Sequence, residues 1–180
     1  MPDHPRVESS RALRTRGAIV DAFIELAFEH RYDAIRVSDL ITRAGVGKST
    51  FYEHFHGKDD VLLEAVAPVL LALATAASGR AARSYVREMV GHLWERRSIG
   101  RPIIDSMTAP IIQRRLAEAI RPHAVRAGLA EGNSSISATG IAAAQLAMLR
   151  CWLAGHAAAT IDDMTDQLIA CARILESDRR

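Results

Sequence analysis

The stretch VSDLITRAGVGKSTFYEHFHGK, residues 37–58, decides the fold of the first third of the chain. Its first eight residues place apolar side chains at spacings of three and four, which predicts a helix over 37–44 with one buried face. Gly45 follows, and glycine both ends helices and tolerates a positive φ. A second short helix is predicted over about 48–55. The stretch therefore predicts two short helices joined by a tight turn.

The second of these helices has two chemically different faces. Phe51 and Phe55 lie four positions apart and are expected to point inward. The outward face carries side chains that can each donate a hydrogen bond: Lys48, Ser49, Thr50, Tyr52 and His54. A short helix that is anchored on one side and rich in donors on the other suits the groove of a polyanion.

The segment AGVGKSTFYEHFHGKDDVL, residues 44–62, resembles the DNA-binding signature of tetracycline-repressor-type (TetR-family) transcriptional regulators. The Ala-Gly-Val turn, the Thr-Phe-Tyr-x-His-Phe helix and Lys58 match, and Arg16 and the Tyr-Asp-Ala at 32–34 also fit. The resemblance is close over about 15–63 and only general beyond. It implies an all-α, nine-helix architecture: an N-terminal three-helix domain with a helix-turn-helix, over 1–57, and a C-terminal helical ligand-sensing and dimerisation domain, over 58–180.

The resemblance also implies which residues contact DNA: Arg16, Arg36, Ser38, Gly47, Lys48, Ser49, Thr50, Tyr52, His54 and Lys58. For Arg16, a phosphate contact and a solvated helix face are both open interpretations. Arg36 departs from the family, which usually has Ser or Thr at this position. Arginine has no acceptor for the capping hydrogen bond, so it cannot replace them as a cap. Ser38 could cap a shorter helix, or Asp39 could cover the free amides.

The same stretch contains Gly-Val-Gly-Lys-Ser-Thr, which resembles the end of a phosphate-binding loop. That motif requires a glycine five positions before Gly47, where this chain has Thr42. We also find no His-Glu-x-x-His, no Gly-x-Ser-x-Gly and no histidine pair at metal spacing. We therefore expect no enzyme activity, no catalytic residues, no metal and no cofactor.

Bulk composition limits the class of DNA binder. The 180 residues carry a formal net charge of only +2, and residues 1–60 hold nine basic against ten acidic residues. This balance counts against a binder driven by charge alone. The first residues are polar, so no signal peptide is predicted, and the stretch 140–159 is better interpreted as a buried helix than as a membrane span. We expect a cytoplasmic, nucleoid-associated protein, with Cys151 and Cys171 as reduced core residues.

Downstream of residue 58 the pattern remains helical. Helices are expected over about 59–77, kinked at Pro68, over 80–97 and over 100–107. A further helix begins at Pro110 and is bent or interrupted at Pro122. Residues 131–135 are predicted as a loop from their composition, followed by helices over 137–159 and 161–176.

Two groups of residues in this C-terminal part are candidates for contacts with partners. The expected lining of a small-molecule pocket is Met89, His92, Trp94, Met107, Met148, Cys151 and Trp152. The expected homodimer interface, through the last two helices, includes Ala143, Ala147, Ala154, Leu168 and Ala172. For both groups, ordinary packing in the core of one chain is the alternative.

Together these expectations describe a sequence-specific, homodimeric transcriptional repressor that a small-molecule effector releases from a palindromic operator. The alternative is a helical nucleoid or scaffold protein that binds DNA without an effector. The chain does not identify the effector, the operator or the regulated genes.

Overall fold

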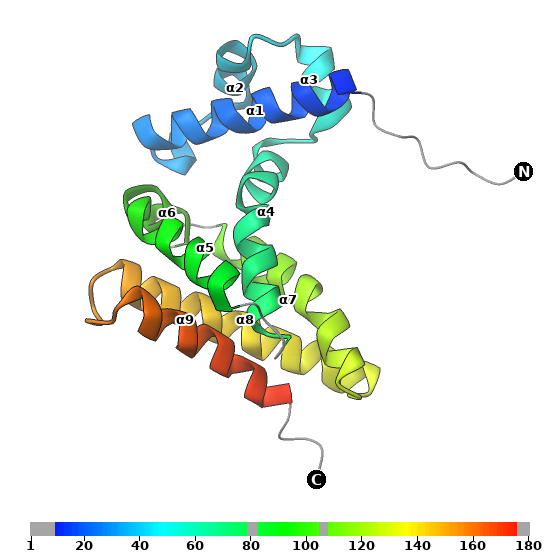
Figure 1. The fold of residues 1–180 in the computed structure, drawn as a ribbon. Helices are drawn as coiled ribbons and strands as arrows, with labels where there is room; N and C mark the ends of the chain where they lie inside the picture. The colour runs from blue at the N-terminus through cyan, green and yellow to red at the C-terminus, as the bar shows by residue number, and fades with distance from the viewer. Residues whose placement is uncertain (1–9, 79–82, 105–107, 176–180) are drawn as a thin grey trace, which may run out of the picture. The chain divides into compact units, whose positions relative to one another are not determined.

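The computed structural model describes residues 10–78, 83–104 and 108–175. Within these ranges the chain forms nine α-helices, two 3-10 helices and no strand, so the all-α fold is confirmed (Figure 1). The α-helices are α1 (Ser10–Glu29), α2 (Val37–Ala44), α3 (Lys48–His54), α4 (Lys58–Ala76), α5 (Arg83–Glu95), α6 (Arg97–Ile104), α7 (Ala109–Arg126), α8 (Glu131–Leu153) and α9 (Ile161–Ala170). The 3-10 helices are η1 (Tyr32–Ala34) and η2 (Cys171–Leu175).

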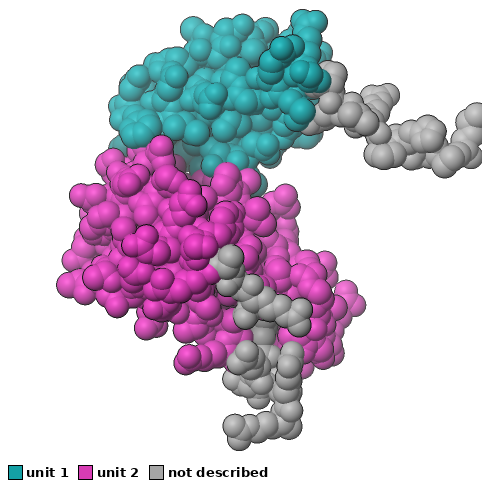
Figure 2. All heavy atoms as spheres, viewed as in Figure 1, with its two compact units in different colours: residues 1–65 teal, residues 66–180 magenta. Residues whose placement is uncertain are grey.

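The chain divides into two compact units, residues 1–65 and 66–180 (Figure 2). Helix α4 begins in unit 1 and continues into unit 2, so its first two turns pack with the N-terminal helices. The compact boundary therefore lies eight residues after the predicted domain boundary at residue 57.

Unit 1 is organised by the inner face of α1. Ile19, Phe23 and Leu26 are buried at spacings of three and four, as an amphipathic helix requires. They share a core with Leu40 of α2 and Phe51 of α3, both fully buried. This core is what holds the two short helices in place, since helices of seven and eight residues are marginal on their own.

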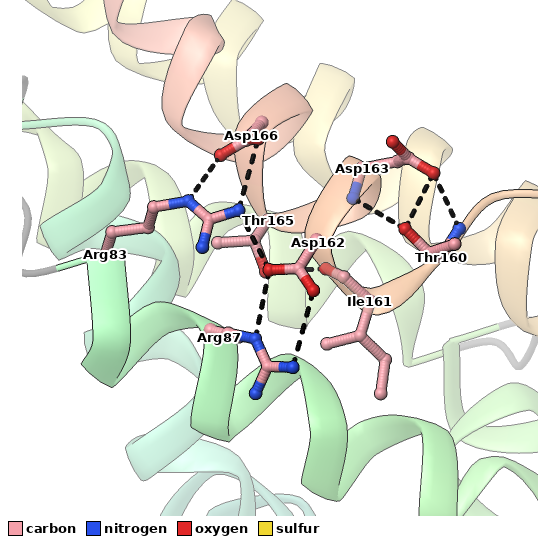
Figure 3. Close-up of polar contacts among 8 residues, drawn as sticks. All are labelled: Arg83, Arg87, Thr160, Ile161, Asp162, Asp163, Thr165 and Asp166. Carbon is pink, nitrogen blue, oxygen red and sulfur yellow. Dashed lines mark hydrogen bonds and ion pairs between the residues drawn. The ribbon is translucent and has the colours of Figure 1, made fainter.

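Unit 2 is built around α8, whose buried residues repeat at helical spacing along its whole length. Helices α7 and α8 pack along their lengths, and α5 packs against α9. Arg83 and Arg87 of α5 hold Asp162 and Asp166 of α9 through ion pairs of 2.8–3.0 Å (Figure 3). We call these four residues the α5–α9 ion-pair cluster.

Several helix limits differ from the predicted ones. Residues 131–135 are helical rather than a loop. The Ser134 amide donates to the Ala130 carbonyl at 2.8 Å, and the hydroxyls of Ser134 and Ser135 bond back to the Glu131 carbonyl without breaking the helix. Helix α7 continues through Pro122, which is exposed, so that water can reach the carbonyl that loses its partner. Helix α8 ends at Leu153, six residues early, and residues 171–175 are 3-10 helix.

Helix α8 is the one described helix that is long and apolar enough to cross a membrane by length and composition. It packs against α7 and η2, and its apolar residues alternate with exposed positions such as Arg150. Core helices of globular domains often pass the same test, and this packing fits that interpretation.

Candidate nucleic-acid interface

The turn between α2 and α3 depends on Gly45. Its φ of 65° lies in the left-handed region, where a side chain is strained. The Gly45 amide donates to α2, and the Val46 amide donates to the Ile41 carbonyl at 3.2 Å, which covers carbonyls at the helix end. Gly47 is extended, and its carbonyl accepts the Phe51 amide at 2.9 Å, starting α3. Three residues thus turn the chain from one helix into the next.

Helix α3 is anchored through one face, as the sequence predicted. Phe51 and Phe55 are 0% and 2% exposed, with ring centroids 6.0 Å apart. Lys48, Ser49 and Tyr52 are exposed, whereas Thr50 and His54 are half-buried. The Tyr52 ring stands edge-on to Phe51 at 5.3 Å, so its position is fixed while half of it faces solvent. Glu53, absent from the predicted set, shares the exposed side.

The start of α2 decides between the two capping alternatives. Arg36 is the N-cap residue, and its amide donates to the Asp39 carboxylate at 2.9 Å. The helix begins at Val37, so Asp39 covers a free amide and Ser38 does not cap a shorter helix. Ser38 donates a long hydrogen bond to Asp39 at 3.4 Å and is exposed. The Arg36 side chain cannot act as a cap, and it remains exposed to solvent.

Two of the predicted cations are used inside unit 1. Arg16 donates to the His54 carbonyl at 3.2 Å and to Glu64 at 3.1 Å, and its guanidinium lies 4.8 Å from the centre of the Phe55 ring. It therefore braces the end of α3 against α1 and α4. The sequence did not indicate these contacts, because the partners lie 38 and 48 residues away.

Lys58 is held even more closely. Its ammonium donates to the carbonyls of Tyr32 and Ile35, both at 3.0 Å, and lies 4.3 Å from the centre of the Tyr32 ring. The Tyr32 hydroxyl in turn donates to Asp59, and burial together with this carboxylate raises the pKa of Tyr32. Lys58 thus ties the start of α4 to η1, a contact that a cation at a helix N-terminus does not indicate by sequence alone.

Lys48 and Arg36 differ from these two cations. Among the described residues neither has an ion pair or hydrogen bond from its side chain, and both are exposed. Three carboxylates of unit 1 are held by other arginines: Glu25 and Glu29 hold Arg43, and Glu64 holds Arg16. Lys48 therefore places an unpaired positive charge at the start of α3, and Arg36 places another at the start of α2, although the basic and acidic residues of unit 1 nearly cancel.

The structure brings two of the residues predicted to line a ligand pocket into direct contact. Trp94 stacks on Trp152 at 4.6 Å, and the Trp152 indole donates to the Ala159 carbonyl at 2.8 Å. His92 is exposed between Glu88 and Glu95. Cys151 is also exposed and is therefore not the core residue that the sequence predicted. Met89 and Met148 are half-buried, and Met107 lies outside the described residues.

An open groove of about 600 Å³ lies instead between α7 and α8. None of the seven predicted ligand residues lines it. It is lined by Ala109, Pro110, Gln113, Arg114, Ala117, Glu118, Arg121, Ser135, Ala138 and Thr139. Sequence analysis missed it because the groove depends on how α7 and α8 pack, which the residue spacing within each helix does not show.

The predicted dimer residues separate into two groups. Ala147 is exposed, and Ala143 and Ala154 are half-buried on the same side of α8. Leu168 and Ala172 are buried within the single chain, at 0% and 6% exposure, and contribute to its own core. The described residues contain no group of His, Cys, Asp or Glu that could hold a metal ion.

Comparison with known proteins agrees with this geometry. Residues 19–65 match the model of the family described as "Bacterial regulatory proteins, tetR family". An uncharacterized HTH-type transcriptional regulator, YwcC of Bacillus subtilis (strain 168), is 41% identical over 46 residues, which are 26% of this chain and 21% of that protein. A second from the same organism, YxbF, is 36% identical over 53 residues, 29% of this chain and 14% of that protein. These matches span about a fifth or less of the relatives' lengths.

Solved structures extend the likeness to the whole fold. A TetR transcriptional regulator from Streptococcus agalactiae 2603V has a TM-score of 0.56 at 22% identity, over 90% of this chain and 95% of that one. The dihydroxyacetone kinase operon activator DhaS has a TM-score of 0.53 at 17% identity, over 92% and 96%. At these identities the likeness concerns the fold, and these proteins are regulators rather than enzymes.

Fold and site together define an all-helical protein, over the described residues, with an N-terminal helix-turn-helix unit. The N-terminal unit belongs to the tetR family of bacterial regulatory proteins.

Proposed function

We propose that the protein is a homodimeric, sequence-specific DNA-binding transcriptional regulator, a repressor that a small-molecule effector releases from a palindromic operator. The observation that carries this proposal is the pair of unpaired cations, Lys48 at the first residue of α3 and Arg36 at the N-cap of α2. A helix anchored by Phe51 can enter the major groove while cations at its edge meet phosphates.

The ten predicted DNA-binding residues then fall into four roles. Lys48, Arg36 and Ser38 are the candidates for phosphate contacts, while Ser49, Thr50, Tyr52 and His54 are those for the groove. Gly47 lets the backbone approach closely, since it carries no side chain at the start of α3. Arg16 and Lys58 position α3 and α4 through their bonds inside unit 1.

The phosphate role of Lys48 can be tested by salt dependence. Each phosphate contact releases about one counterion and carries no base sequence information. Lys48→Gln should weaken binding to selected operator and to scrambled duplex alike, and should lower the salt slope by roughly one for each half-site. The measurement is fluorescence anisotropy across a salt series, with the operator selected from a random duplex library.

Arg114→Gln is the matched control, because it removes the same charge from an exposed position in unit 2. It should leave both affinity and slope unchanged. If Lys48→Gln lost affinity for operator only, at an unchanged slope, the phosphate assignment would be wrong. A footprint without edges, spread along any DNA, would favour the nucleoid or scaffold alternative.

The homodimer follows from the exposed side of α8, where Ala147 lies between the half-buried Ala143 and Ala154. Small side chains allow two copies of a helix to approach closely about a two-fold axis. Ala147→Arg would place an unpaired charge in that contact, costing roughly 3 kcal/mol or more. Sedimentation should then detect monomers, whereas Ala119→Arg, at an exposed position of α7, should leave the dimer intact.

An effector bound in unit 2 would complete the mechanism. Coupling between two sites is typically about 1–3 kcal/mol, and it is reciprocal, so operator DNA must weaken the effector by the same factor. Such a regulator would act in the cytoplasm, at the nucleoid.

A further inference from the structure

Among the described residues of unit 2, one buried side-chain polar atom has no hydrogen-bond partner. The buried polar residues among those described are Thr108, Ser134, Gln145 and Thr165. Each of the three hydroxyls donates to a backbone carbonyl at 2.7–3.2 Å. The Oε1 atom of Gln145, in contrast, is buried and has no hydrogen-bond donor among the described residues.

The orientation of the Gln145 amide is fixed by its other half. The Nε2 group donates to the carbonyl of Leu73 in α4 at 3.1 Å and to that of Leu168 in α9 at 3.3 Å. Exchanging the oxygen and nitrogen would set Oε1 against two carbonyl oxygens, which would repel it. Oε1 must therefore point away from both carbonyls.

The packing of α8 against α4 and α9 accounts for the hydrogen bonds of Nε2 but supplies no donor to Oε1. Leu168 is among the last four residues of α9, whose carbonyls lack a partner within the helix, so Nε2 caps that end. A buried amide carbonyl without a donor costs about 1–3 kcal/mol. Since no donor among the described residues reaches Oε1, the atom is open to a donor from a bound molecule.

We propose that Oε1 of Gln145 accepts a hydrogen bond from an uncharged small molecule that carries a hydroxyl or N–H group, and that this molecule is the effector. Ile141, Leu149 and Trp152 lie on the same buried face of α8 as Gln145, so the rest of the ligand meets apolar side chains. This proposal rests on the proposed function, and it adds to it the chemical class of the effector and the residue that selects it.

The surroundings select an uncharged ligand. No charged side chain is buried among the described residues, so an ionic ligand would lose its hydration without gaining a counter-charge. A carboxylate would in addition be repelled by Oε1 itself. An alcohol, a phenol or a neutral amide supplies the donor without this cost.

The Gln145 side chain also connects binding of the ligand to the position of α4. Its Nε2 group bridges α4 and α9, and α4 is the helix that begins in unit 1 at Lys58. A ligand that pulls on Oε1 changes the two bonds of Nε2, because one rigid amide group holds both atoms. Binding of the ligand is thereby linked to the position of α4.

The test compares pairs of nearly equal shape in which a hydroxyl replaces a methyl or methylene end: phenol with toluene, benzyl alcohol with ethylbenzene, and 1-naphthol with 1-methylnaphthalene. Calorimetry on the purified protein should find the hydroxyl member at least about tenfold tighter in one or more pairs, equivalent to about 1.4 kcal/mol. Benzoate should not bind. The same hydroxyl probe should weaken operator binding.

Gln145→Met keeps the side-chain length and removes the acceptor, so it should abolish the hydroxyl preference. Gln167→Met, an exposed position on α9, is the matched control and should retain it. If Gln145→Met does not fold, a crystal structure of the wild-type protein with the hydroxyl probe replaces it, with the probe oxygen expected at about 3 Å from Oε1.

Three outcomes would overturn the proposal: no hydroxyl preference in any pair, a preference that survives in Gln145→Met, or a probe oxygen elsewhere in the crystal. The first outcome, with Gln145→Met as stable as wild type, would assign the acceptor to a buried water alone. Operator binding without probes separates the two hypotheses: its absence refutes the proposed function, whereas its presence without a hydroxyl preference refutes only this inference.

Discussion

The α2–α3 region of unit 1 and the α5–α9 region of unit 2 both place arginine or lysine on short helices, but they use those charges differently. At the start of α3 and of α2, Lys48 and Arg36 have no side-chain partner among the described residues. Between α5 and α9, Arg83 and Arg87 are held by Asp162 and Asp166, whose carboxylates raise the pKa of Arg83 further (Figure 3).

The difference shows that an unpaired cation on a fixed helix indicates a surface open to an anionic partner, whereas the presence of a cation alone does not. Paired charges on a surface hold two elements together and contribute little beyond that. Unpaired charges next to an anchored helix remain available to a polyanion. Net charge does not distinguish paired from unpaired cations, since between residues 10 and 65 there are eight basic and nine acidic residues, which nearly cancel.

The largest expected effect concerns the anchor of α3. Phe51 is fully buried, and Phe51→Ala should lower the free energy of unfolding by about 3–5 kcal/mol through lost burial and a residual cavity. Chemical denaturation measures this change. Tyr52→Ala, next in the chain but 49% exposed, should cost under about 1 kcal/mol. Equal losses for the two variants would mean that α3 is not anchored through one face.

A smaller effect should separate the two lysines of the chain. Lys58→Met removes two hydrogen bonds from a charged donor to backbone carbonyls, and should cost about 1.5–3 kcal/mol of stability. Lys48→Met should change stability by less than about 0.5 kcal/mol, because its side chain has no partner to lose. Denaturation of both variants tests this contrast, and a loss for Lys48→Met as large as that for Lys58→Met would contradict it.

These residues also show how far the sequence could be interpreted. The apolar spacing in 37–44, the glycine at 45 and the phenylalanines at 51 and 55 act over a few positions, so the turn and the two faces of α3 were predictable. The partners of Arg16 and Lys58 lie 23 to 48 residues away, and only the folded chain brings them together.

Unit 2 was less predictable for the same reason. The candidate ligand residues were chosen by chemical type along the helices, but whether they face one interior depends on how the helices of unit 2 pack. Gln145 is identified only by its surroundings: its burial, its two carbonyl partners and its unsatisfied oxygen. In sequence it is an ordinary polar residue in an alanine-rich helix.

The smallest expected effect concerns the α5–α9 ion-pair cluster. The guanidinium groups of Arg87 and Arg83 lower the pKa of Asp162, and that of Arg83 lowers the pKa of Asp166, below the usual carboxyl range. A carboxyl with a lowered folded-state pKa stabilises the protein above its unfolded-state pKa, near 3.8, and loses that contribution as the pH falls through the folded-state pKa.

Asp162→Asn should therefore lower Tm slightly at pH 7, and the difference from wild type should shrink as the pH falls below about 4. The effect is small because all four side chains are about half exposed, so water screens the pairs, and added salt should reduce it further. Asp21→Asn is the control and should leave Tm unchanged, because Asp21 is exposed on α1 and has no hydrogen bond or ion pair from its side chain among the described residues. Thermal melts monitored by circular dichroism between pH 3 and 8 measure all three proteins. A difference in Tm for Asp162→Asn that stayed constant down to pH 3 would show that the carboxylate charge is not what joins α9 to α5. Arg83 and Arg87 could then no longer serve as the paired cations in the comparison with Lys48 and Arg36.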